Sequence, residues 1–536
     1  MLPMQMVTGL KLKHLIVFIF IGIMIIACSP TRVIRELHYP YPYPAPYSTK
    51  IFNKNVKVHM KDGCLYMLDS LIKNSSPETV RGYGSYYNQY REIIKSNVDS
   101  SGIRIAPVFQ IPLSDVALFE TNDVIRATGK ILAMALIGVP TAIITAYCII
   151  NPKACFGSCP TFYAWDGVDT SLMAEGFSSS ILRSFEKKDI DMLYWSKVTG
   201  DDFRLRLTNE ALETHVIKYA DLLVFPRANN ERVFATEDGK FFKTSDIRSP
   251  STCIAPEGDC REAIKQMDHR ERYSAADSTN LIQREYIEMN FDSLPGGKLG
   301  LIVGCRQTFL TTYLFYQSLA YLGNSAGYFA ARIESGDNNL KKRVNRVWEV
   351  LGGIEVFVQN SNGGWTKVSQ IEEMGPIATD VHLIELPKTG TTTLKVKLRL
   401  TKGLWRIDYL ALAKLEQSVE PIKIKPSLVI RENSIENNLE SQLTDTLKPL
   451  ITLPGDVYNL RYVFPDISKN YEVFLCSKGY YIEWMRETWL AEENLKRASL
   501  MFGFPKLFMR MAAVDFKKIE PTMEDNFWRS RYVKKN

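Results

Sequence analysis

Short segments in which apolar and polar residues alternate recur along this 536-residue chain. Residues 394–400 (LKVKLRL) and 203–207 (FRLRL) are the clearest of them. Alternation with a period of two places every second side chain on the same face of a β-strand, so that one face can be buried. Gly-containing turns follow many of these segments. The pattern predicts a mainly β protein with helical segments, that is, an α+β chain of several domains.

The spacing of these segments divides the chain into units. Hydrophobic residues make up 46% of the chain and charged residues 23%, which is typical of globular proteins and excludes a disordered one. At about 150 residues per domain, we expect three or four domains. The predicted boundaries place a small β domain at 51–121, a β-rich domain that ends in helices at 161–335, an antiparallel β-sandwich at 340–415 with its strands near 346–415, and a C-terminal region at 424–536 that is first β and then helical, with a helix over 480–497.

The first 28 residues carry a pattern of their own. Lys11 and Lys13 precede an uncharged apolar run at 15–26, and Ala27 and Cys28 follow it. The run is short for a membrane span and is typical of a signal peptide. The Ile-Ile-Ala-Cys end resembles the lipobox of bacterial lipoproteins. The resemblance implies removal of residues 1–27 and lipidation of Cys28, with an uncleaved signal anchor as the alternative.

Residues 28–50 then form a Tyr- and Pro-rich stretch that predicts an extended tether. A lipid on Cys28 would make the membrane a partner of the protein and place it in the bacterial cell envelope, on an outer-membrane or periplasmic face.

A second uncharged apolar run covers residues 131–150, within a predicted unit at 122–160. Its 20 residues are long enough to cross a bilayer. Gly138 and Pro140 interrupt its centre, and positive charges do not favour the orientation that a lipid on Cys28 requires. A transmembrane span, a buried helical hairpin, a re-entrant element and an apolar helix under the next domain all remain open.

Close cysteine pairs are a further feature. Cys155 and Cys159 flank a Gly-containing loop, and Cys253 and Cys260 flank another. In an oxidising compartment such spacings suit local disulfide bonds. The four cysteines in apolar surroundings are predicted to be core thiols, namely Cys64, Cys148, Cys305 and Cys476. The Cys-Phe-Gly-Ser-Cys-Pro segment at 155–160 is similar to one in uncharacterised bacterial lipoproteins, which have no assigned activity.

Residues 323–327 (GNSAG) match the G-x-S-x-G pattern that carries the nucleophilic serine of α/β-hydrolases. In those enzymes the serine lies on a sharp turn between a strand and a helix. The residues before Ser325 predict a helix rather than a strand, so a Gly-bounded link between two helices is the competing interpretation. Ser325 is therefore a weak catalytic candidate, and we expect no enzyme.

Other ligand classes find little support in the chain. Its histidines lack the spacing of metal ligands, and no Gly-rich phosphate loop is present, so neither a metal nor a cofactor is expected. The net charge of +7 is dispersed, which gives no reason to expect nucleic acid. Trp365 follows a Gly-Gly turn and is a candidate for binding a protein or glycan partner.

These patterns lead to one expected function and two alternatives. We expect a lipid-anchored envelope protein that binds a partner or forms part of an assembly. The first alternative is an envelope serine hydrolase that uses Ser325. The second is an assembly component that inserts residues 131–150 into the membrane.

Overall fold

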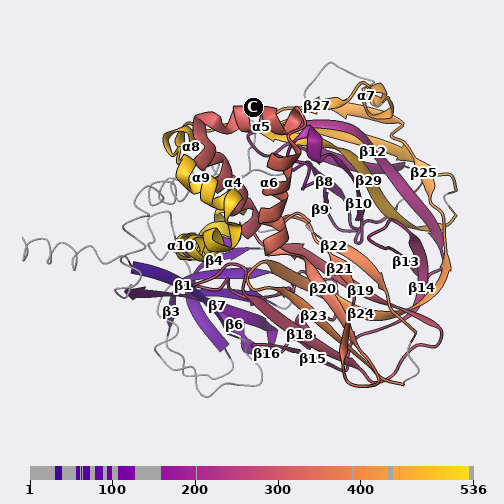
Figure 1. Cartoon of the computed structure of the whole chain (residues 1–536). Coiled ribbons are helices and arrows are strands. Elements are labelled where there is room, and N and C mark those ends of the chain that lie inside the picture. The colour runs from indigo at the N-terminus through magenta and orange to yellow at the C-terminus, as the bar shows by residue number, and fades with distance from the viewer. Residues whose placement is uncertain are drawn as a thin grey trace, which may run out of the picture.

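The computed structural model describes residues 31–38, 56–126 and 159–529, with short gaps at 61, 63, 73–78, 88–92, 99–106, 199, 201, 373, 389–391, 433–438, 446 and 467. Within these residues the protein is mainly β, with five antiparallel sheets and a group of helices at one end (Figure 1). This confirms the predicted fold class. Cys28, Cys155, Cys148 and the apolar run at 131–150 lie outside the described residues.

Four of the sheets form a stack, which we number 1 to 4. Sheet 1 contains β26 (Leu428–Arg431), β28 (Val457–Val463), β11 (Asp202–Thr208), β8 (Thr161–Trp165) and β9 (Thr170–Glu175). Sheet 2 contains β10 (Lys187–Met192), β29 (Asn470–Glu483), β12 (Glu213–Arg227) and β25 (Ile422–Ile424), with β27 (Leu450–Thr452) also paired to β12. Strands β12 and β29 form the longest ladder of the stack; β12 begins and β29 ends near the helices.

The other two sheets form the second half of the stack. Sheet 3 contains β13 (Arg232–Ala235), β14 (Phe241–Arg248), β24 (Trp405–Ser418), β19 (Lys298–Gln307) and β22 (Asp380–Glu385), with β17 (Arg272–Tyr273) paired to β24. Sheet 4 contains β16 (Gly258–Asp259), β15 (Thr252–Ala255), β18 (Arg284–Phe291), β23 (Leu394–Thr401), β20 (Ile354–Gln359) and β21 (Trp365–Ile371).

The inner sheets 2 and 3 are buried on both faces. In β12, Leu222 and Val224 pack into the core shared with sheet 1, whereas Leu223 and Phe225 pack into the core shared with sheet 3. In β19, Ile302 faces sheet 2. A strand with two buried faces is a continuous apolar run, whereas a strand with one buried face alternates. The continuous apolar runs in the sequence therefore correspond to strands of the inner sheets.

The predicted sandwich near 346–415 is present but larger than predicted. Strands β20, β21 and β23 belong to sheet 4, whereas β22 and β24 belong to the facing sheet 3. Earlier strands of the chain, from β13 to β19, complete both sheets. Chain order did not reveal this, because the β-rich unit predicted at 161–335 contributes strands to all four sheets.

The small N-terminal sheet follows the order β1 (Thr31–His38), β7 (Val116–Arg126), β2 (Val56–Met60), β3 (Leu65–Ile72), β4 (Thr79–Tyr87) and β5 (Ile93–Ser96), with β6 (Phe109–Pro112) paired to β4. It has its own core, which includes Val58, Leu68 and Phe119. The small β domain predicted at 51–121 is thus present, with β1 as an additional edge strand.

The α-helices of the described residues are α4 (Leu310–Leu322), α5 (Ala326–Glu334), α6 (Asn338–Leu351), α7 (Glu440–Thr444), α8 (Glu487–Ala491), α9 (Leu495–Gly503) and α10 (Pro505–Arg529). All except α7 gather beside the end of the stack. The helix predicted over 480–497 was wrong at its start, because β29 continues to Glu483 and only α8 and α9 follow. Among the described residues, no helix is long and apolar enough to cross a membrane.

Candidate functional site

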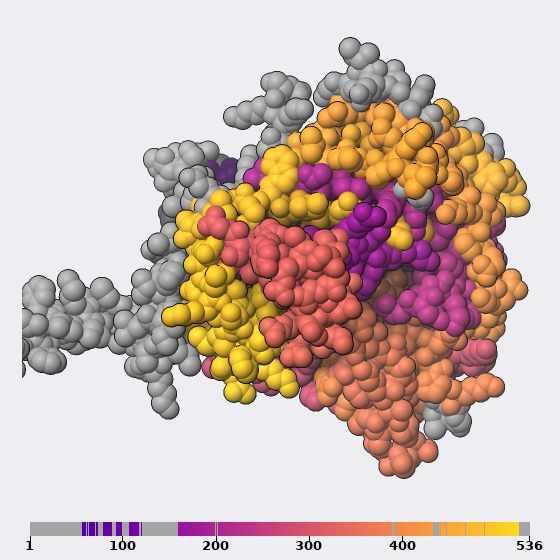
Figure 2. Space-filling view, turned by 45° about the horizontal axis from the view of Figure 1, so that its top comes forward, coloured from indigo at the N-terminus to yellow at the C-terminus, as the bar shows by residue number. Residues whose placement is uncertain are grey.

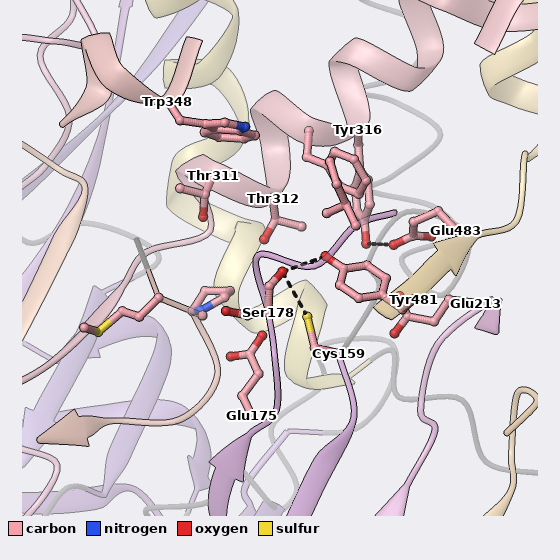
Figure 3. A pocket seen from close by; sticks show the side chains of 15 residues that line it. Cys159, Glu175, Ser178, Glu213, Thr311, Thr312, Tyr316, Trp348, Tyr481 and Glu483 are labelled. Carbon is pink, nitrogen blue, oxygen red and sulfur yellow. Dashed lines mark hydrogen bonds between the residues drawn. The ribbon is translucent and has the colours of Figure 1, made fainter. Parts of the chain in front are cut away.

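A polar pocket lies where helix α4 meets the ends of strands β9 and β29 (Figure 3). Its volume is about 50 Å³, which is enough for a few water molecules. Thr311, Thr312 and Tyr316 line it from α4, and Trp348 closes it from α6. Carboxylates from three strands point toward it. The elements that meet here are far apart in the sequence, so the pocket exists only in the complete fold.

Glu483 is the last residue of β29, and both oxygens of its carboxyl group have hydrogen-bond partners. Tyr316 donates its hydroxyl proton to Oε1 over 3.0 Å, and Arg486 donates from Nη2 to Oε2 over 3.1 Å. The Arg486 guanidinium also lies 4.0 Å from the centre of the Trp489 ring. A carboxylate whose oxygens are both engaged is held in a fixed orientation, so Glu483 presents a defined edge to the pocket.

Glu213 is the first residue of β12 and lies beside Glu483. Its Oε1 is 2.9 Å from Nε2 of the buried His215. Burial raises the pKa of Glu483 to about 8, while Arg486 opposes the shift; the neighbouring Glu213 adds to it through its charge and a side-chain hydrogen bond. Two carboxyl groups in such contact share a proton rather than both being ionised. This pair can therefore donate or accept a proton near neutral pH.

Glu175, at the end of β9, is the third carboxyl group. Its Oε2 accepts a hydrogen bond of 2.7 Å from the backbone N–H of Ile377. Burial raises the pKa of Glu175 to about 7, and hydrogen bonds, led by that from Ile377, oppose the rise. A Cβ at Gly375 would lie 2.0 Å from the same oxygen, so a larger residue there would displace the Glu175 carboxyl group from its present position.

Cys159 and Tyr481 form the remaining polar wall. Both side chains point to the carbonyl oxygen of Ser178, with distances of 3.8 Å from the Cys159 sulfur and 3.0 Å from the Tyr481 hydroxyl. Burial raises the pKa of the Cys159 thiol well above its ordinary value. The thiol is therefore neutral at physiological pH, which disfavours a role as a nucleophile.

A second, apolar chamber adjoins the polar pocket. Its volume is about 230 Å³, larger than the 150 Å³ cavity known to accept benzene in another protein. Side chains from α4, α5, α6 and α9 surround it, including Leu319, Ala330, Val347 and Phe502. Figure 2 shows the corresponding face, on which the salmon helices lie between the yellow C-terminal segment and the purple segment near residue 180.

The two spaces share part of their walls. Ile181, Phe315, Trp348 and Glu483 line both. The two spaces are therefore adjacent, with buried carboxyl groups lining one and mainly hydrocarbon side chains lining the other.

The structure does not bring the sequence-predicted site residues together. Ser325 is half-buried in the 3-10 turn Gly323–Ser325 that joins α4 to α5, without the preceding strand of a hydrolase. A serine hydrolase needs a histidine beside its nucleophile. His382 contacts Asp380 and Glu237, not Ser325. The geometry corresponds to the Gly-bounded link between helices.

The structure also shows the surroundings of Trp365 and of the described cysteines. Trp365 is half-buried at the start of β21, and the Lys397 ammonium lies 3.9 Å from the centre of its ring. Cys253 and Cys260 bring their buried sulfurs to 3.0 Å from each other. Cys305 and Cys476 are buried, as expected of core thiols, whereas Cys64 is half-buried. Of the described residues, no group of His, Cys, Asp or Glu could hold a metal ion.

Sequence reasoning missed the carboxyl groups of the pocket. Glu213 and Glu483 end two long strands, where a charged residue ordinarily faces water. One sequence feature could have drawn attention to Glu483, because this acid directly follows the apolar sequence Tyr-Tyr-Ile. Only the tertiary structure shows that α4 covers this end of the strand. Cys159 was selected for its spacing to Cys155 and lies instead in the wall of the pocket.

Comparisons with known proteins add little to the site. No protein-family model matches the chain, and no curated protein sequence matches it. Among solved structures, a β-porphyranase of glycoside hydrolase family 86 from Bacteroides plebeius shares 7% identity over 47% of this chain and 39% of its own, with a TM-score of 0.15. Dimeric latent PorU from Porphyromonas gingivalis shares 8% identity over 84% of this chain and 31% of its own, with a TM-score of 0.14. The chain thus spans less than half the length of either protein, and neither TM-score supports a functional inference.

Proposed function

We propose that this protein is a lipid-anchored binding protein of the bacterial envelope and that its ligand is an amphiphilic small molecule. One observation carries the binding role, namely that a polar pocket with buried carboxyl groups shares a wall with an apolar chamber. The lipid anchor rests on the sequence around Cys28 alone.

The apolar chamber supplies the driving force for binding. Removing apolar surface from water contributes about 25 cal/mol per Å². Several residues that line the chamber, among them Leu322, Val347 and Phe502, also belong to the main hydrophobic core, which holds the walls in place. The polar pocket would then fix the orientation of the ligand, because its hydrogen-bonding groups lie at one end only.

A fluorescent probe tests this function. The neutral dye N-phenyl-1-naphthylamine gains fluorescence in apolar surroundings, and we expect saturable binding of one dye per protein. Ala330 lines the chamber and Ala331 is exposed on the same helix. Ala330→Trp should fill the chamber and weaken binding about tenfold or more, a loss of at least about 1.4 kcal/mol.

The matched control is Ala331→Trp, which adds the same indole on the outer face of α5 and should bind like the wild-type protein. Equal affinity in the two variants, or a fluorescence signal that does not saturate, would show that the chamber is not the binding site.

A further inference from the structure

We infer that the ligand carries a cationic amine: its ammonium group would lie in the polar pocket among Glu175, Glu213 and Glu483, with its hydrocarbon part in the apolar chamber. This inference rests on the proposed binding function and names the class of ligand. It concerns a site that the sequence did not indicate.

The charges of the polar pocket favour a cation. Three carboxyl groups reach it from three different strands, and one guanidinium, that of Arg486, faces them. That guanidinium is already engaged by Glu483 and stacked on Trp489. Within the described residues that line the pocket, acids thus outnumber cations. An ammonium head group can be balanced by ionisation of one of these acids, whereas a carboxylate head group would add a further acid to the pocket without adding a cation.

The arrangement of the three acids also suits an ammonium group. Each N–H of an ammonium is a donor, and the group accepts no hydrogen bonds. The pocket offers carboxyl oxygens from three different strands. The rings of Tyr316 and Trp348 complete the wall, and aromatic faces attract cations.

The volumes of the two spaces limit the size of the head group and of the hydrocarbon part of the ligand. A pocket of about 50 Å³ admits a group of the size of an ammonium, whereas a sugar ring or a phosphate ester needs more room. The chamber of about 230 Å³ accepts a hydrocarbon chain or a ring system. Phe185 lines the chamber, and the Lys341 ammonium lies 4.9 Å from its ring and donates to the Ser184 carbonyl. The cationic end of the ligand is therefore favoured away from Phe185.

Binding of an amine should release a proton. Burial raises the pKa of Glu483 to about 8 and that of Glu175 to about 7, so these two groups hold protons near neutral pH. The groups packed around them are His215 on β12, Tyr316 on α4, Arg486 after β29, and Cys159 and Tyr481 in the wall. When an alkylammonium ion enters, one carboxyl group becomes a carboxylate and its proton leaves to solvent, so the ligand remains protonated and charge is balanced.

Calorimetric titration tests the inference with decylamine, decanol and decanoate at pH 7. We expect decylamine to bind at least about tenfold more tightly than decanol, and decanoate to bind most weakly. Titrations in two buffers of different ionisation enthalpy should show protons released with decylamine and none with decanol.

Glu483→Gln should abolish the preference for decylamine while decanol binding is retained, which also shows that the variant is folded. Glu175→Gln should reduce the preference independently. Glu349→Gln, on the exposed face of α6 next to Trp348, is the matched control and should behave like the wild-type protein. Equal binding of decanol and decylamine would overturn the inference but leave the proposed function intact. If neither these ligands nor the naphthylamine dye binds, the proposed function itself fails.

Discussion

Glu483 is buried, which opposes ionisation of its carboxyl group, and its contacts hold the side chain in place. Its side chain is 4% exposed, and its pKa is raised from 4.5 to about 8 mainly by burial. An acid whose pKa is higher in the folded state binds more protons there than in the unfolded state. Its contribution to stability is therefore present below pH 4.5 and is lost as the pH rises toward 8.

This sign gives a stability prediction. Glu483→Gln should leave the free energy of unfolding nearly unchanged at pH 4.5 and increase it by a few kcal/mol at pH 8, since one pKa unit corresponds to about 1.4 kcal/mol. Urea unfolding followed by tryptophan fluorescence across this pH range measures the difference. A variant that is less stable than the wild-type protein at pH 8 would contradict the assigned direction, and Glu349→Gln provides the control.

Single residues of the site were the least predictable from sequence. Ser325 and Cys159 stand out because they belong to recognisable spacings, whereas Glu175, Glu213 and Glu483 stand at strand ends without a motif. A carboxyl group acquires its unusual pKa from the segments packed over it, and those segments come from hundreds of residues away. The sequence pattern around each residue does not show which distant segments pack over it.

At the scale of elements, the sequence was more informative. Alternation predicted β11 and β23, and the residues before Ser325 predicted the helix that forms α4. The end of β29 was misread because Tyr480–Glu483 has helix-compatible spacing with the residues that follow. Pairing with β12 decides the matter, since Glu483 lies opposite Glu213 in the ladder.

Helix α10 connects the N-terminal sheet to the remainder of the protein. Lys57 on β2 is buried, and its ammonium donates to the carbonyl oxygen of Pro521 over 2.8 Å and to Glu120 over 3.3 Å. Glu120 also accepts a hydrogen bond of 3.0 Å from the Tyr273 hydroxyl in sheet 3. These contacts join three parts of the chain at one buried carboxylate.

We therefore expect Lys57→Met to loosen this junction. Removing one partner of a buried ion pair costs about 3–5 kcal/mol. Hydrogen–deuterium exchange should become faster in β2 and in the C-terminal half of α10, while β12 and β29 remain protected. Lys95→Met, at an exposed position of β5 in the same sheet, should leave exchange unchanged. The same rates in both variants would argue against a role of Lys57 in docking.

At the scale of the whole molecule, the fold class was predictable but the domain boundaries were not. The stack of four sheets takes strands from residues 161–483, so units that look separate in sequence share cores. β-Sheets pair strands that are distant in sequence, and alternation does not identify the partner strand.

The proposed lipid anchor on Cys28 would determine where the whole molecule is located. If Cys28 is lipidated, globomycin should cause a longer precursor that retains residues 1–27 to accumulate in the bacterial host, and radioactive palmitate should label the mature protein. Cys28→Ser should prevent the labelling. Unchanged processing in the presence of globomycin would contradict the lipobox assignment.

The most direct test of the binding site is a crystal structure of the protein with decylamine. We expect an alkyl chain between Phe315, Trp348 and Phe502, with the nitrogen within hydrogen-bond distance of a carboxyl oxygen of Glu483 or Glu175. A chamber that remains empty at saturating decylamine, or an amine bound elsewhere on the surface, would contradict the proposed binding site.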